Sequence, residues 1–87
     1  MAPHQQMPVP QAEMSPQALC NKVRDWAEAQ GYGFVQGAHA SEFAKVTVTD
    51  PAGGHSTVVV PNAHHGRRLR RDQVRYTALK LDANWKD

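Results

Sequence analysis

Hydrophobic positions first recur at helical spacing along this chain. Ser15 followed by Pro16 predicts a helix start, because serine caps a first turn and proline has no N–H to lose there. Gly31 predicts the end of this helix, since glycine tolerates the left-handed backbone of a helix terminus. Between these signals the apolar residues form one stripe, made of Leu19, Val23, Trp26 and Ala27.

After this helix the spacing changes to the alternation that is typical of strands. Residues 32–35 predict a short strand, and residues 42–49 predict a longer one with a single buried face, formed by Ala44, Val46 and Val48. Turn-forming residues at 50–54 separate it from a β-branched run at 55–60, which Pro61 ends. The last two strands are therefore predicted to form a hairpin.

The C-terminal part returns to helical spacing. A second helix is predicted from Leu69 or Arg70 to Trp85, with an apolar stripe made of Val74, Ala78, Leu81 and Trp85. The order predicts an α+β fold, α-β-β-β-α, with two helices on one face of a three-stranded antiparallel sheet. The proline-rich residues 1–14 are predicted to form a disordered tail, leaving one domain at 15–87. That domain is small enough for a homodimer to enlarge its core.

Composition excludes several classes of protein. The 87 residues have a mean hydropathy of −0.63 and lack a long apolar run, so no membrane span is expected. No secretory signal precedes the domain, and a cytoplasmic location is expected. The single Cys20 reads as a core residue and excludes an internal disulfide. Phosphate-loop and nucleophile-elbow motifs are absent, and neither a cofactor nor a metal site is expected.

The distribution of charge indicates an anionic partner. Residues 1–60 carry a net charge of −2 and residues 61–87 one of +4, although the whole chain carries only +2. Most of the excess comes from five arginines at the start of the second predicted helix, namely Arg67, Arg68, Arg70, Arg71 and Arg75. A helix N-terminus already attracts anions, so this cluster is predicted to hold phosphates. The alternative is a loop of solvated charges.

Other candidate contacts lie before this cluster. If the strand that contains Glu42 ran back to His39, then His39, Phe43 and Lys45 would share the open face of the sheet by alternation. A histidine, an aromatic ring and a lysine in a row suit a nucleotide through proton transfer, stacking and phosphate contact. His64 and His65 precede the arginines and are further candidates for anion contact.

Several short motifs resemble the HicA family of small bacterial toxins. They are Gly31-Tyr32, Gly37-Ala38-His39, a hairpin turn with Pro51 and Gly53, Val58-Val59-Val60-Pro61, a histidine-containing loop and a basic helix. The resemblance covers residues 15 to about 82 of the sequence. It implies a fold similar to a double-stranded RNA-binding domain, metal-independent mRNA cleavage by one histidine, and a partner antitoxin.

Two alignments to this family lead to different functions. The family's Gly-Ser-His motif would place catalysis on His39, with Ala38 in the position of the serine. The stretch from His39 to Pro51 is longer than in the family, and placing Phe43 at the histidine position preserves the strand alternation. The first alignment predicts an endoribonuclease, and the second predicts a relative without catalysis that binds RNA or a protein. A non-catalytic protein that binds an acidic surface of a host or antitoxin protein is the alternative.

Overall fold

The computed structural model describes residues 4–63 and 67–87. It confirms the predicted α-β-β-β-α order. The elements are α1 (Pro16–Ala29), β1 (Gly33–Gly37), β2 (Ala44–Thr49), β3 (His55–Val60) and α2 (Arg71–Ala83). Neither helix in these residues is long and apolar enough to cross a membrane.

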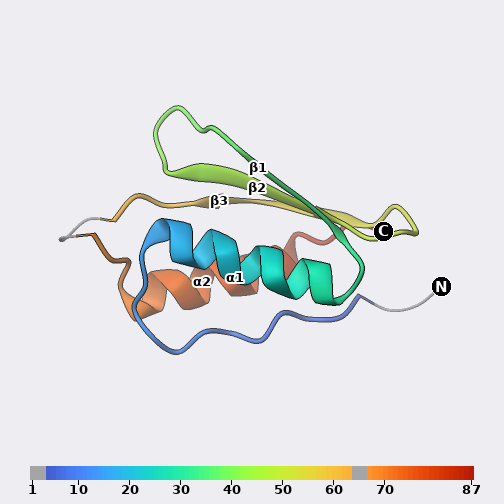
Figure 1. Cartoon of the computed structure of the whole chain (residues 1–87), viewed down its shortest axis with the longest axis horizontal. Helices are drawn as coiled ribbons and strands as arrows, with labels where there is room; N and C mark the ends of the chain where they lie inside the picture. The colour runs from blue at the N-terminus through green and yellow to red at the C-terminus, as the bar shows by residue number, and fades with distance from the viewer. Residues whose placement is uncertain (1–3, 64–66) are drawn as a thin grey trace.

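The three strands form one antiparallel sheet in the order β1-β2-β3, so β2 is central and the other two strands are edges. Alternation along β2 places Ala44, Val46 and Val48 on one face, where each is at most 2 % exposed. Both helices lie on that face, with α1 packed against β1 and α2 packed against β3 (Figure 1). The opposite face of the sheet has no covering layer among the described residues.

Helix α1 has the boundaries and the buried stripe that its sequence predicts. The Ser15 hydroxyl accepts a hydrogen bond of 3.1 Å from the N–H of Ala18, which caps the first turn. Gly31 follows the helix with a φ of 75°, a left-handed conformation that glycine adopts without steric cost. The predicted stripe residues are all buried. Local sequence signals therefore fix both ends of this helix.

The boundaries of three other elements differ from the predictions. Strand β1 covers Gly33–Gly37 in place of residues 32–35. Strand β2 begins at Ala44, so it does not extend back to Glu42. Helix α2 ends before Trp85 and begins at Arg71, after Leu69. Leu69 lies outside the helix and is completely buried. Its backbone pairs with that of Met14, and its N–H donates a hydrogen bond of 2.7 Å to the Met14 carbonyl.

The turn between β2 and β3 is held by a hydrogen bond between its backbone and the Asp50 side chain. The Asp50 carboxylate accepts a 2.8 Å hydrogen bond from the N–H of Gly54, and Gly53 has a φ of 98°. A Cβ atom at Gly54 would lie 2.8 Å from Nε1 of Trp85, so a side chain there would collide with the indole. Glycine is required at both positions, for conformation at the first and for space at the second.

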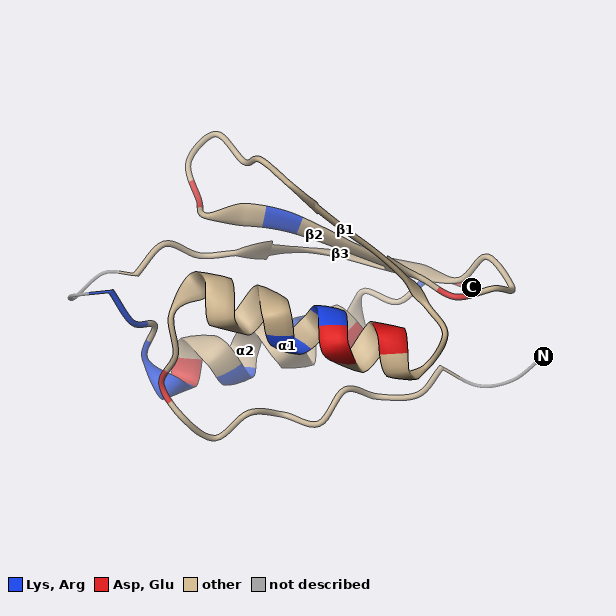
Figure 2. Ribbon diagram, viewed as in Figure 1, with Lys and Arg blue, Asp and Glu red and all other residues tan. Residues whose placement is uncertain are grey.

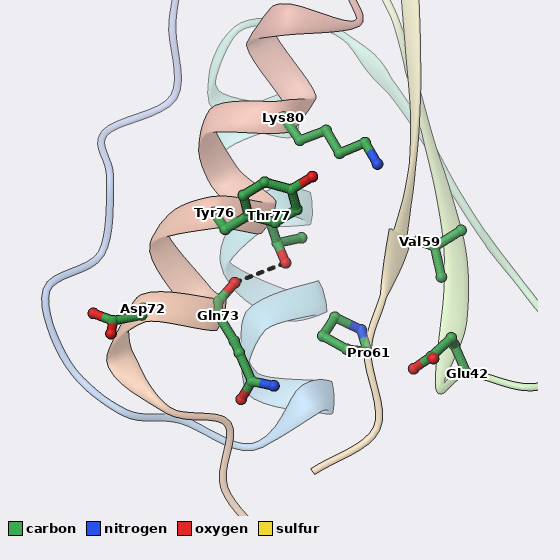
Figure 3. Close-up of a pocket in the computed structure, with 8 residues that line it drawn as sticks. All are labelled: Glu42, Val59, Pro61, Asp72, Gln73, Tyr76, Thr77 and Lys80. Atoms are coloured by element: carbon green, nitrogen blue, oxygen red, sulfur yellow. Dashed lines mark hydrogen bonds between the residues drawn. The ribbon is translucent and has the colours of Figure 1, made fainter. Parts of the chain in front are cut away.

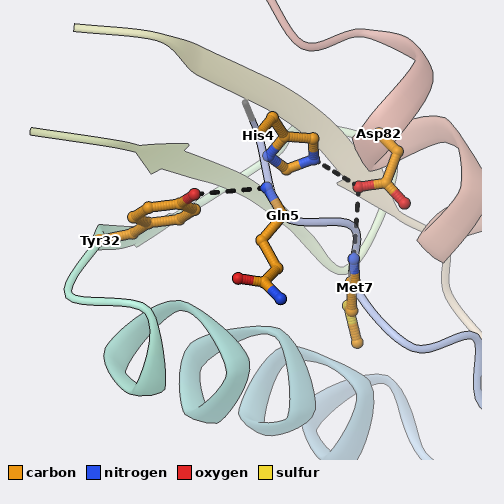
Figure 4. Close-up of polar contacts among 5 residues, drawn as sticks. All are labelled: His4, Gln5, Met7, Tyr32 and Asp82. Carbon is orange, nitrogen blue, oxygen red and sulfur yellow. Dashed lines mark hydrogen bonds and ion pairs between the residues drawn. The ribbon is translucent and has the colours of Figure 1, made fainter. Parts of the chain in front are cut away.

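The N-terminal segment differs most from its prediction. Residues 4–14 run along the two helices and contribute Met7 and Met14 to the core, where they are 5 % and 8 % exposed. His4 attaches this segment to the C-terminal part of the chain (Figure 4). Its Nε2 lies 2.7 Å from an Asp82 carboxylate oxygen, and its ring stacks on Trp85 with centroids 3.9 Å apart. The prolines of this segment lack backbone N–H donors, but its methionine side chains still pack into the core.

Replacing Met7 with alanine tests whether this segment belongs to the folded core. We expect Met7→Ala to lower the free energy of unfolding by about 2 kcal/mol, because it leaves a cavity between the segment and the helices. Urea denaturation measures the change. Gln6→Ala is the control, since Gln6 is exposed, and its effect should stay within about 0.5 kcal/mol. Equal effects of the two substitutions would contradict the packing of residues 4–14.

Candidate functional site

The five predicted arginines lie together at one end of the molecule. Figure 2 shows them where the chain enters α2, near the end at which β2 begins. Each of them is exposed. Arg67, Arg68 and Arg70 precede the helix, Arg71 opens it, and Arg75 follows one turn later on the same flank. The cluster is defined here as the arginine surface.

The start of α2 adds its own positive potential to this surface. The N-cap residue is Arg70, whose guanidinium has only donors and cannot accept from the N–H groups of the first turn. Its backbone N–H donates instead to the Gln73 side chain over 3.0 Å. Asp72 is the one acidic residue of the first turn. Among the described residues, no side-chain acceptor faces the N–H groups of the first turn, and these donors lie beside several cations in an arrangement suited to an anion.

The arginine surface is not neutralised within the described chain. The ion pairs found in residues 4–63 and 67–87 are His4 with Asp82 and Arg24 with Asp25, and neither involves this surface. Arg68 has a structural contact, because its guanidinium donates to the Glu13 carbonyl over 2.9 Å. That carbonyl carries no net charge, so the positive charge of Arg68 remains available to a ligand.

A shallow hollow of about 540 Å³ lies beside the arginine surface. The hollow is lined by residues of the N-terminal segment and of the α2 start, namely Gln11, Ala12, Glu13, Arg70, Arg71 and Asp72. Residues 11–13 were predicted to be part of a disordered tail, so their contact with this surface is not evident from the sequence. The one signal in the sequence was the pair of methionines, Met7 and Met14, in an otherwise polar segment.

His39 lies in the loop between β1 and β2, so the predicted row of His39, Phe43 and Lys45 on one strand is wrong. Its Nδ1 accepts hydrogen bonds of 3.2 Å from the N–H groups of Ser41 and Glu42. These two donors assign the proton of a neutral imidazole to Nε2. In this arrangement Nε2 cannot accept a proton, and Nδ1 is occupied by the loop. The ring organises the β1–β2 loop, and general base chemistry would require it to leave these contacts.

Phe43 and Lys45 lie apart from the arginine surface. Phe43 comes directly before β2, is 36 % exposed and donates its N–H to the Val60 carbonyl over 3.0 Å. It therefore lies beside the residues that precede Pro61. Lys45 is exposed on the open face of the sheet, between two buried residues of β2. The sheet separates this face from the helices, so the two predicted contact regions form different faces of one end of the molecule (Figure 2).

The remaining candidates for chemistry are two histidines, a metal site and a cysteine. His64 and His65 lie outside the described residues. Within the described part of the chain, no three His, Cys, Asp or Glu side chains lie close enough together to hold a metal ion. Cys20 is completely buried in α1, and burial raises the pKa of its thiol. A buried thiol that retains its proton is a poor nucleophile, which agrees with its assignment to the core.

The role of His39 in its loop is testable by hydrogen exchange. His39→Ala removes the acceptor for two backbone N–H groups, and a hydrogen bond of this kind contributes about 1 kcal/mol. We expect the amides of Ser41 and Glu42 to exchange roughly five to ten times faster in the variant. His55→Ala is the control, because His55 makes its contacts through the backbone. Unchanged exchange at Ser41 and Glu42 would show that the ring does not hold the loop.

The raised pKa of the Cys20 thiol gives a stability that depends on pH. In the unfolded chain the thiol ionises near its ordinary pKa of about 8.5, whereas the folded chain keeps the proton to higher pH. The free energy of unfolding should therefore fall as the pH rises above this value. Urea denaturation of the native chain and of Cys20→Ala between pH 7 and pH 10 measures the difference, and the variant should lose this part of the decline.

Comparison of the chain with protein-family models, with curated proteins and with solved structures found no significant match. The similarity to HicA toxins therefore stays a prediction from the sequence motifs. What the molecule itself provides for a functional argument is the arginine surface, the loop that His39 organises and the open face of the sheet.

Proposed function

We propose that this protein binds structured RNA, and that the arginine surface holds the phosphates of the RNA backbone. The observation that carries the proposal is the concentration of five exposed arginines around the start of α2, with no carboxylate in ion-pair contact among the described residues. Placing like charges this close is unfavourable unless an anion compensates them. A polyanion compensates several of them at once.

The choice of RNA rests on shape and on the sequence motifs. In double-stranded RNA the backbone phosphates and 2′-hydroxyls are more accessible than the base edges of the deep groove. A surface made of arginines and backbone N–H groups suits such a ligand, because guanidinium groups bind phosphate in a bidentate manner. The motifs shared with HicA toxins also favour RNA. Phe43 and Lys45 would contact a nucleotide only where the RNA passes around the end of the sheet.

We further propose that the protein binds RNA without cleaving it. His39 uses Nδ1 to hold its own loop, so it is poorly placed to take a proton from a 2′-hydroxyl. Phe43 lies next to Val60, directly before β2, and its phenyl ring carries no proton to transfer. Both observations favour a binding module.

The arginine surface is tested by the salt dependence of RNA binding. Each arginine that contacts a phosphate contributes about 0.7 to 0.9 to the slope of log affinity against log salt concentration. We expect Arg71→Gln and Arg75→Gln each to reduce the slope by about that amount and to weaken binding roughly fivefold near 0.1 M salt. Fluorescence anisotropy with a labelled 20-base-pair RNA duplex measures both quantities.

Arg24→Gln is the matched control for these substitutions. Arg24 is an exposed arginine of α1 that lies 3.4 Å from the Asp25 carboxylate, so its replacement should leave the slope unchanged. Undetectable binding, or an affinity that stays flat between low and physiological salt, would refute the proposal. The remaining explanation for the arginine surface would then be an acidic protein partner.

The absence of cleavage is tested separately. We expect the duplex and a single-stranded mRNA to remain intact after incubation with the protein in EDTA, as judged by denaturing gel electrophoresis. The His39→Ala variant should give the same result as the native chain. Cleavage that requires His39 would contradict the non-catalytic proposal and would leave the arginine surface as the substrate-binding surface of a ribonuclease.

A further inference from the structure

A groove of about 400 Å³ runs along the outer edge of β3, between that strand and α2 (Figure 3). Helix α2 contributes five residues to the groove, namely Asp72, Gln73, Tyr76, Thr77 and Lys80. Gln73, Tyr76, Thr77 and Lys80 follow one another at helical spacing on a single flank. Val59 contributes from β3, Pro61 from the residue directly after the strand, and Glu42 from the loop before β2. Tyr76 is 63 % exposed and Val59 is 39 % exposed, although both are large apolar side chains. This feature is called the β3 groove.

The β3 groove and the hollow beside the arginine surface share Asp72 at the start of α2, and further along they occupy different flanks of that helix. Arg71 and Arg75 are one helical turn apart on the flank of α2 that faces the N-terminal segment, where Arg71 lines the hollow beside Gln11. Tyr76 and Lys80 are one turn apart on the flank that faces β3. Apart from Asp72, a ligand on one flank therefore leaves the residues of the other flank free.

The backbone of β3 offers hydrogen-bonding groups to the groove. His55 exchanges hydrogen bonds with Lys86, at 2.9 Å and 2.8 Å, so its N–H and carbonyl point away from β2. Because backbone direction alternates along a strand, the N–H and carbonyl groups of Thr57 and Val59 point the same way. Within the described residues, the bridge at His55 is the only pairing on this edge. The edge therefore accepts an antiparallel strand and is open beyond its first position.

The charged residues along the groove are complementary to those of a second copy of the chain. Glu42 and Asp72 lie at the end where β3 stops and α2 starts, and Lys80 lies about two helical turns further along α2. A second copy that approaches with its strand antiparallel would place Lys80 beside the acidic end of the first groove. Twofold symmetry repeats this contact, so both copies gain the same complementary pair.

We propose that the β3 groove is the interface of a homodimer, in which the β3 edges of two copies pair antiparallel and form a continuous six-stranded sheet. The main-chain groups of Thr57 and Val59 supply the hydrogen bonds, as in other cases of strand addition. Tyr76 and Val59 of each copy become covered by the other copy. A symmetric contact of this type closes on itself and leaves no open edge at β3 for further copies.

Sedimentation velocity on the full chain between about 1 µM and 1 mM tests the proposal. We expect a reversible monomer–dimer equilibrium in this range. Lys80→Glu alone and Asp72→Lys alone should each raise the dimer dissociation constant at least about tenfold, because each places like charges face to face. The double variant exchanges the two signs and should restore dimerisation to within about threefold of the native chain.

Matched controls separate the groove from general effects of charge and folding. Lys22→Glu makes the same change of charge on the exposed surface of α1 and should leave the dimer intact. Val59→Lys should abolish the dimer, whereas Val35→Lys, the same substitution on the β1 edge strand, should not. Circular dichroism verifies that each variant is folded, and the charge-swap rescue remains informative if a valine variant is not.

Hydrogen exchange gives a readout that depends on the position of the interface. The amides of Thr57 and Val59 should exchange more slowly as the protein concentration rises. By the same alternation the Gln36 amide lies on the free edge of β1, and its exchange should not depend on concentration. A chain that is monomeric at about 1 mM, or a dimer that neither Lys80→Glu nor Val59→Lys weakens, would overturn the proposal.

Discussion

The single buried face of β2 is the constraint on which the other elements depend. Ala44, Val46 and Val48 point to the same side of the central strand, and water has to be excluded from all of them at once. One helix is too narrow to cover three strands, so α1 covers the β1 side and α2 covers the β3 side. The polar face of the sheet and the outward flanks of both helices are left for other contacts.

This arrangement also decides where the charged and apolar surfaces lie. Helix α2 packs beside β3 through Val74, Ala78 and Leu81, which divides its exposed surface into two flanks. The arginines fall on the flank next to the N-terminal segment, and Tyr76 falls on the flank next to the β3 edge. RNA binding and dimerisation would thus use different sides of one helix. A twofold dimer would present two arginine surfaces to one RNA, which raises the effective concentration of the second surface once the first is bound.

The N-terminal segment gives the domain more core than its length suggests. Met7 and Met14 fill the space outside the two helices, and His4 closes the segment against Trp85 and Asp82. The pairing of Met14 with Leu69 also holds the chain that leads into α2. The positions of Arg68 and Arg70 therefore depend on a segment that lies more than fifty residues earlier in the sequence. Met7 and Met14 are two of the sixteen buried hydrophobic residues among the described residues, so this segment enlarges the core of a small domain.

Local patterns alone determined the elements, their order and their buried faces. The Ser15 cap, the alternation in residues 44–49 and the turn at 50–54 each act through near neighbours, so the sequence contains all the information that they need. Tertiary structure decided the rest. The start of α2, the packing of residues 4–14 and the contacts of His39 depend on groups that are distant in sequence or on a loop without periodicity. The sequence placed five cations within nine residues. Only the folded chain decided that these cations share one end of the molecule and that a groove lies on the other flank of α2. The physical reason is that a helix distributes neighbouring residues around its axis, and packing then selects which of them remain exposed.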